Sequence, residues 1–92
     1  MLMIKKVDCQ SEGNKKVIAY LVQLRIEHGF SIKELSRLSG INEFKLRLTE
    51  KYLRRMKLNE VALLAIVYKR NVIDFCMELY EIYKYHTLKG AI

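Results

Sequence analysis

The chain has 92 residues, no proline and no tryptophan, and a formal net charge of +7 from 17 Lys and Arg against 10 Asp and Glu. This length has room for one small domain, and 51% hydrophobic residues exclude a disordered basic tail. Because so small a domain has little spare stability for a deep catalytic cleft, we expect no enzyme activity. The positive charge indicates a polyanionic partner, nucleic acid first and an anionic membrane surface second.

The first fourteen residues are expected to form an N-terminal arm, with a short strand at Leu2 to Val7, ahead of a domain over 15–92. Turn-forming residues at 11–14 close this stretch. From Asn14, which can cap a helix, apolar residues recur at helical spacing as far as His28. Gly29 then predicts the end of the first helix.

Two short helices are predicted next. Ser31 and Glu34 have the spacing of a capping box, which predicts that a second helix begins at Ser31. Gly40 ends it, and Asn42 supplies the N-cap of a third helix that runs to about Leu53. Residues 40–42 are therefore the whole connection between the two helices.

Two further helices complete the predicted fold. Val61, Leu64, Ala65 and Tyr68 lie on one face of a fourth helix, which Asn71 is expected to end. A fifth helix is predicted from about Val72 to Tyr85. The sequence therefore predicts an all-α fold of five helices.

Two helices joined by three residues form a helix-turn-helix, which holds its second helix clear of the core so that N-terminal side chains reach base edges. Ser36 and Gly40 provide the small residue and the glycine that such a turn requires. Ile41 and Leu46 are expected to point into the core. The residues of the third helix that then face outward are Glu43, Phe44, Arg47 and Lys51.

Over roughly residues 20–75 the chain resembles the lambda repressor and Cro (Cro/C1-type) family of helix-turn-helix regulators. The likeness lies in Leu24-Arg25, His28-Gly29-Phe30-Ser31, Lys33-Glu34-Leu35-Ser36, Leu38, Gly40-Ile41-Asn42, Leu46, Glu50, Leu58, Val61, Leu64, Ala65 and Val72 to Phe75. The resemblance implies a lambda-repressor-like domain with a central helix-turn-helix. It also implies a small, dimeric, cytoplasmic transcriptional regulator such as a repressor, without cofactor.

Four residues depart from the pattern of that family. Thr49 stands where the family buries an aliphatic side chain, and Tyr52 where a glycine often ends the recognition helix. Lys57 occupies the position of a capping Ser or Thr, and Ile32 replaces a Gln that braces the recognition helix. These departures concern the reading of the DNA groove more than the fold.

Basic residues concentrate around the predicted recognition helix. Residues 33–57 hold eight Lys and Arg against three Glu, which is +5 of the total +7. Such a cluster neutralises phosphates, and Arg47 is best placed to pair with guanine. We expect base contacts from Glu43, Phe44, Lys45 and Arg47. We expect phosphate contacts from Lys33, Arg37, Lys51, Arg54 and Arg55.

A second apolar stripe on the same helix leaves an alternative open. Phe44, Leu48 and Tyr52 recur at i, i+4 and i+8. In the register of the family, Leu46 and Leu53 are buried while Phe44 and Leu48 are exposed, where Phe44 can touch a thymine methyl. Alternatively the stripe packs in the core, or binds a protein partner and makes the domain an interaction module of an antitoxin-like or phage-encoded adaptor type.

Specific DNA sites usually require two copies of so small a domain, so a dimer surface is expected. The last helix is the best candidate, because aromatic and apolar side chains suited to an interface crowd along it. The predicted interface residues are Leu79, Tyr80, Ile82 and Tyr83. The alternative is that this helix packs on the first helix of the same domain.

Other chemistry is sparse in the sequence. His28 and His86 share no metal-ligand spacing, and Cys9 and Cys76 are expected to be reduced thiols. No glycine-rich phosphate loop, catalytic set or apolar run of membrane-spanning length is present. We therefore expect no metal, no cofactor and no small-molecule ligand.

Overall fold

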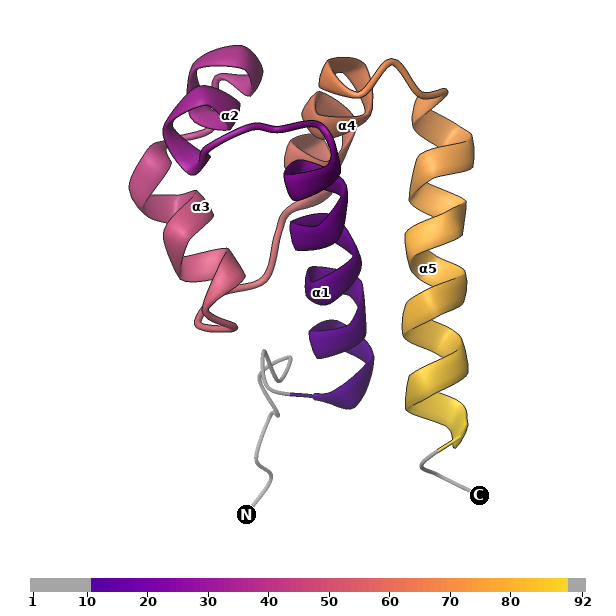
Figure 1. Cartoon of the computed structure of the whole chain (residues 1–92). Helices are drawn as coiled ribbons and strands as arrows, with labels where there is room; N and C mark the ends of the chain where they lie inside the picture. Colours follow the sequence, from indigo (N-terminus) through magenta and orange to yellow (C-terminus); the bar gives the residue numbers. More distant parts are fainter. Residues whose placement is uncertain (1–10, 90–92) are drawn as a thin grey trace.

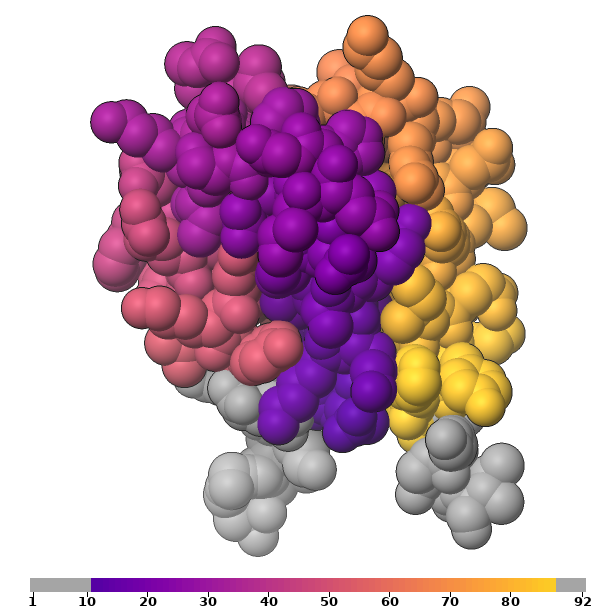
Figure 2. All heavy atoms as spheres, in the orientation of Figure 1, coloured from indigo at the N-terminus to yellow at the C-terminus, as the bar shows by residue number. Residues whose placement is uncertain are grey.

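The computed structural model describes residues 11–89, which form five α-helices and no strand (Figure 1). The helices are α1 (Glu12–Glu27), α2 (Ile32–Ser39), α3 (Glu43–Glu50), α4 (Leu58–Val67) and α5 (Val72–Lys89). Over these residues, the prediction of an all-α fold of five helices is confirmed. Side chains fill the space between the α3 and α1 ribbons (Figure 2).

The helix α1 begins two residues earlier than Asn14. Ser11 is the N-cap and its hydroxyl accepts a hydrogen bond from the Asn14 amide at 3.2 Å, so the prediction that Asn14 caps this helix was wrong. At the other end, Gly29 adopts φ +73° and ends the helix as predicted. The predicted strand at Leu2 to Val7 lies outside the described residues.

The start of α2 is the capping box that the sequence predicts. The Ser31 hydroxyl accepts from the Glu34 amide, and the Glu34 carboxylate accepts from the Ser31 amide, both at 3.0 Å. Two backbone N–H groups that the helix cannot satisfy are thereby paired. This cap fixes where α2 begins directly after the first helix.

The α4–α5 connection differs from the prediction. Asn71 does not end α4, which stops at Val67 with Tyr68 as its C-cap. Instead, the Asn71 side chain accepts from the Asp74 amide at 3.0 Å and so caps the start of α5. The helix α5 continues to Lys89, four residues beyond the predicted end at Tyr85.

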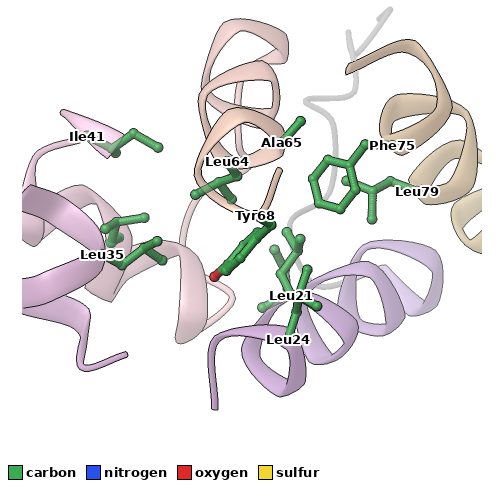
Figure 3. Packing of buried hydrophobic residues seen from close by; sticks show 11 residues of the cluster. Leu21, Leu24, Leu35, Ile41, Leu64, Ala65, Tyr68, Phe75 and Leu79 are labelled. Carbon is green, nitrogen blue, oxygen red and sulfur yellow. The ribbon is translucent and has the colours of Figure 1, made fainter. Parts of the chain in front are cut away.

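The hydrophobic core draws on all five helices and on the turn before α3. Figure 3 shows side chains from α1, α2, α4 and α5 and from that turn converging around Tyr68. Phe75 of α5 is 1% exposed and Ala65 of α4 is fully buried, so these two helices share one interior. The buried apolar residues are Ile18, Leu21, Leu24, Leu35, Ile41, Leu46, Leu64, Ala65, Tyr68, Phe75 and Leu79.

The helix α5 packs along α1, as Figure 1 shows. Gly13 permits the close approach, because a Cβ there would lie 2.8 Å from the carbonyl oxygen of Tyr83. Leu79 is buried in the core and Ile82 packs against it. The monomer therefore already uses the predicted interface residues Leu79 and Ile82, as the alternative of packing on the first helix expected, while Tyr80 remains exposed.

Within residues 11–89, no helix combines the length and the apolar character needed to cross a bilayer.

Candidate nucleic-acid interface

The connection between α2 and α3 is a three-residue turn closed by short hydrogen bonds. Gly40 adopts φ +82°, and its amide donates to the Ser36 carbonyl oxygen at 2.8 Å. The Ser36 hydroxyl donates to the Ile41 carbonyl oxygen at 2.6 Å. Asn42 caps α3 by accepting from the Lys45 amide at 3.1 Å. The roles predicted for Gly40 and Asn42 are confirmed.

One face of α3 is fixed in the core. Leu46 and Thr49 are each 2% exposed, and Ile41 in the preceding turn is 4% exposed. The Thr49 hydroxyl donates to the Lys45 carbonyl oxygen at 2.9 Å, which satisfies a polar group at a position where an aliphatic residue was expected. The helix is therefore held by packing on this side and leaves the opposite side to solvent.

The outer face of α3 carries an aromatic ring and two cations. Phe44 is 66% exposed, and Arg47 and Lys51 are exposed as well. These three side chains lie at i, i+3 and i+7, so they share the side of the helix away from Leu46. The structure thus brings together three of the outward-facing residues predicted from the sequence.

Glu43 and Arg47 contact each other. A carboxylate oxygen of Glu43 accepts a hydrogen bond from Nη2 of Arg47 one turn along the helix. Both side chains are substantially exposed, at 38% and 51%, so the pair contributes about 0.5 kcal/mol or less. The remaining guanidinium N–H groups of Arg47 are free to donate elsewhere.

Beside Lys51, three further exposed cations lie on these two helices: Lys33 and Arg37 on α2 and Lys45 on α3. Within the described part of the chain, no carboxylate lies within the 4.0 Å ion-pair distance of these four side chains. Lys33 and Arg37 are one helical turn apart and share one side of α2. The α2–α3 surface, defined here as Lys33, Arg37, Phe44, Lys45, Arg47 and Lys51, is therefore strongly positive.

The structure corrects the expectation that Arg54 contacts phosphate. Its side chain is only 17% exposed, and its guanidinium donates to the Glu60 carboxylate at 3.1 Å and to the Thr49 hydroxyl at 3.0 Å. Arg55 is exposed, but its guanidinium lies 5.7 Å from the centre of the Tyr83 ring on α5. Neither side chain belongs to the α2–α3 surface.

The Arg54–Glu60 pair ties the end of α3 to the start of α4. Burial would raise the pKa of the Glu60 carboxyl, but hydrogen bonds from Arg54 and the Lys57 amide outweigh burial and hold that pKa below its usual value. The positive charges of Arg54 and Lys45 act in the same direction. Lys57 makes no side-chain cap, and the Glu60 side chain accepts from its amide at 2.9 Å instead.

A second ion pair ties α3 to α1 and was not foreseen. Arg25 donates through Nε and Nη2 to the two carboxylate oxygens of Glu50, at 2.7 and 2.9 Å. Its Nη1 donates to the Phe30 carbonyl oxygen at 2.8 Å. The hydrogen bond with Glu50 raises the pKa of Arg25. Both residues belong to the family-like pattern, which was the available signal.

The apolar stripe of Phe44, Leu48 and Tyr52 does not stay together. Tyr52 adopts φ +63° outside the helix and packs against the core, whereas Phe44 points to solvent and Leu48 is half-buried. The helix α3 ends at Glu50 and not at Leu53 as predicted. Leu53 therefore lies outside the helix and is 59% exposed. The burial expected for Leu53 is therefore wrong.

The two histidines serve as packing groups in the structure. The His28 ring lies 4.7 Å from Tyr68 and 5.8 Å from Phe30, and His86 lies edge-on to Tyr85 at 5.0 Å. Among residues 11–89, no three His, Cys, Asp or Glu side chains gather closely enough to hold a metal ion.

No known protein family, no curated protein sequence and no solved structure matches the chain.

Proposed function

We propose that the α2–α3 surface binds double-stranded DNA and that the protein is a cytoplasmic transcriptional regulator of the helix-turn-helix type. In this proposal the five helices correspond to the lambda-repressor-like arrangement, and α3 lies in the major groove. The observation that best supports it is that α3 has one buried side and one exposed side. Leu46 and Thr49 anchor one side, while Phe44, Arg47 and Lys51 project from the other.

The charge of the surface supports a polyanionic partner. Five cations of the α2–α3 surface are exposed, and only Arg47 has an acidic neighbour within ion-pair distance among the described residues. Cations that neutralise DNA phosphates release condensed counterions, so binding weakens steeply with salt. If three of them, Lys33, Arg37 and Lys51, contact phosphates, the logarithm of the affinity falls with the logarithm of salt with a slope of about −2.7.

The two sets of side chains have different roles in this proposal. Lys33, Arg37 and Lys51 contact phosphates and fix the position of the protein without reading sequence. Arg47 gives up part of its contact with Glu43 and donates hydrogen bonds to guanine O6 and N7. Phe44 contacts a thymine methyl. Lys45 is the third base contact of this arrangement, whereas Glu43, the fourth residue expected to contact bases, serves here as the partner of Arg47. Replacing Arg47 with Ala is expected to weaken binding by about 1–3 kcal/mol and to relax the sequence preference at one base pair only.

The decisive experiment is a titration of the full chain with labelled duplex DNA from upstream of its own gene, against a scrambled competitor. It is repeated at several salt concentrations. We expect selective binding with a salt slope of about −2.7 for each copy bound. Equal affinity for both duplexes would contradict sequence-specific recognition, and a slope near zero would contradict phosphate neutralisation.

A charge-matched pair of variants locates the binding surface. Arg47→Glu with Lys51→Glu lowers the net charge of +7 by four, to +3. Lys16→Glu with Lys69→Glu makes the same change at exposed positions outside the α2–α3 surface. The first variant is expected to abolish binding and the second to weaken it only slightly. Equal losses would mean that net charge, and not this surface, attracts DNA.

The alternative, a protein partner bound through the stripe of Phe44, Leu48 and Tyr52, has less support. Tyr52 packs against the core, so the stripe presents only Phe44 and part of Leu48 to a partner. The variant Phe44→Ala separates the two functions. Loss of a protein partner with unchanged DNA binding in this variant would favour the alternative.

A further inference from the structure

An apolar groove of about 280 Å³ lies where α1, α5 and the start of α4 meet. Val17 and Leu21 line it from α1, Val61 from α4 and Leu79 from α5. Leu58 also lines the groove and is 73% exposed, so the groove is open to solvent. It is therefore a cavity that a ligand can enter and not a packing gap inside the core.

The volume limits what the groove can hold. Taking roughly 30 Å³ for a methylene-sized group, which is the share of one water molecule in the liquid, the groove holds about nine such groups. The pockets of drug-sized ligands are larger, at roughly 300–1,000 Å³. The groove therefore suits one short aliphatic chain and is too small for the two long acyl chains of a membrane lipid.

Positive charge gathers where Tyr80 and Tyr83 line the groove. The same two tyrosines line a smaller hollow of about 170 Å³, so the two cavities adjoin. Cζ of Arg55 lies 5.7 Å from the centre of the Tyr83 ring, and Nζ of Lys84 lies 5.8 Å from the centre of the Tyr80 ring. Both distances are within the roughly 6 Å over which a ring attracts a cation. The two rings therefore hold two cations at this part of the groove.

No acidic side chain pairs with these two cations. In the described part of the chain, no carboxylate lies within the 4.0 Å ion-pair distance of Arg55 or Lys84. The described residues that line the groove and the smaller hollow include no Asp or Glu. A guanidinium whose face lies on a ring keeps the N–H groups at its edge available to an acceptor. An anionic group at this place would thus meet two positive charges.

We propose that this groove binds a medium-chain aliphatic carboxylate, with its alkyl chain along the apolar walls and its carboxylate on Arg55 and Lys84. Burial of the chain removes apolar surface from water, and a guanidinium pairs with a carboxylate through two N–H groups. The sequence predicts no small-molecule ligand, because only the packing of α1, α4 and α5 brings these walls together. The proposal goes beyond the proposed function, because no residue of the groove belongs to the α2–α3 surface.

Calorimetric titration of the full chain, without DNA, with hexanoate, octanoate and decanoate tests the proposal. We expect one decanoate to bind per chain with a dissociation constant on the order of 0.1 mM. Each step of two methylenes should tighten binding about 4- to 16-fold, because the groove covers the alkyl chain wholly or in part. No binding of decanoate, equal affinities for the three carboxylates, or binding to anionic vesicles in place of free decanoate would overturn the proposal.

A charge-matched pair of variants tests the carboxylate contact. Arg55→Gln with Lys84→Gln removes two exposed charges, so the variant should fold, which circular dichroism checks. Lys16→Gln with Lys69→Gln makes the same change in net charge at exposed positions that do not line the groove. The first variant should bind decanoate about 5- to 20-fold more weakly than the wild type. The second should differ by less than about 2-fold. Equal losses would mean that net charge attracts the anion, and would overturn the assigned contact.

The thiol of Cys76 reports where decanoate binds, because this half-buried residue lines the groove. Cys9 is replaced by Ser so that Cys76 is the sole thiol. With decanoate at about ten times its dissociation constant, about nine in ten chains are occupied, so alkylation by iodoacetamide should slow about 10-fold. Unfolding by decanoate would speed the reaction instead. An unchanged or faster rate would overturn the assignment of decanoate to this groove, whatever the outcome of the DNA titration.

Discussion

Tyr68 places both a stabilising ring and an unfavourably buried hydroxyl in the core. Its ring is packed by α1, α2 and α4 (Figure 3), and its hydroxyl is buried with no hydrogen-bond partner among the described residues. Burial raises the pKa of Tyr68 to about 12. A buried hydroxyl without a partner loses its hydration and gains nothing in return. The ring therefore stabilises the fold and the hydroxyl does not.

We expect Tyr68→Phe to leave the free energy of unfolding unchanged or to raise it by up to about 1 kcal/mol. The matched control is Tyr20→Phe, because the Tyr20 hydroxyl donates to Glu78 at 2.8 Å and accepts from Arg70 at 3.0 Å. That variant should be destabilised by about 1 kcal/mol. Urea unfolding at pH 7 measures both, and a Tyr68→Phe loss larger than that of Tyr20→Phe would show a hidden partner of the Tyr68 hydroxyl.

The lowered pKa of Glu60 has a predictable effect on stability. A carboxyl whose pKa is lower in the folded than in the unfolded chain stabilises the fold at neutral pH. That contribution is lost as the pH falls from about 4.5 through the folded-state pKa. We expect the free energy of unfolding of the wild type to exceed that of Glu60→Gln by a constant amount near neutral pH. This difference should narrow below about pH 4.5. An advantage independent of pH would refute this assignment.

Arg54→Met tests the cause of that shift. Without the guanidinium, burial still raises the pKa of the Glu60 carboxyl, and only the Lys57 amide and the charge of Lys45 still lower it. We expect a loss of about 2 kcal/mol at pH 7, because one partner of a largely buried pair is missing. The pKa of Glu60 should then be higher than in the wild type, so the difference in unfolding free energy between the two proteins should narrow near pH 4 as Glu60 takes up a proton.

At the scale of helices, the sequence predicted the ends that carry glycine and missed those that do not. Gly29 and Gly40 take left-handed conformations and end α1 and α2 where expected. Tyr52 and Lys69 do the same after α3 and α4, at φ +63° and +57°. At Lys69 the pattern is the two-bond C-cap, in which amides 69 and 70 donate to carbonyls 66 and 65. No residue type in the local sequence indicates that a helix ends at such a position.

The exposed cap residue Lys69 allows a direct test. A left-handed conformation costs a non-glycine residue about 1 kcal/mol, and glycine adopts it without that strain. We expect Lys69→Gly to be about 1 kcal/mol more stable than Lys69→Ala, which keeps the strain but makes the same change in charge. Thermal and urea unfolding compare the two. Equal stabilities would mean that the loop relaxes around residue 69.

The orientation of α3 was predictable only with the help of the family-like register. Spacing alone left two apolar faces open, and the register that placed Leu46 inward and Phe44 with Arg47 outward agrees with the observed burial. The pairs Arg25–Glu50 and Arg54–Glu60 join residues of different elements, and only the tertiary packing decides that they meet. For the same reason Arg54 reads as a surface cation in sequence and is an internal one in the fold.

At the scale of the whole molecule, charge is divided unevenly between two sides. Residues 33–51, which contain the α2–α3 surface, hold five Lys and Arg against three Glu. The helix α5, on the other side of α1 (Figure 1), holds Asp74, Glu78 and Glu81 against Lys84 and Lys89. DNA that approaches a dipolar distribution of this kind is steered to the positive side. Local charge on that side should therefore matter more for binding than the net charge of +7.

Two substitutions that raise the net charge equally distinguish these effects. Glu43→Gln removes a carboxylate from the edge of the α2–α3 surface and frees the Arg47 guanidinium, whereas Glu81→Gln makes the same change at an exposed position on α5. If α3 faces DNA, Glu43→Gln should tighten binding about 3- to 10-fold at low salt, and the gain should shrink as screening increases. Glu81→Gln should change the affinity less than 2-fold. Fluorescence anisotropy with one duplex at 50 and 200 mM salt measures both, and equal gains for the two variants would place DNA elsewhere on the molecule.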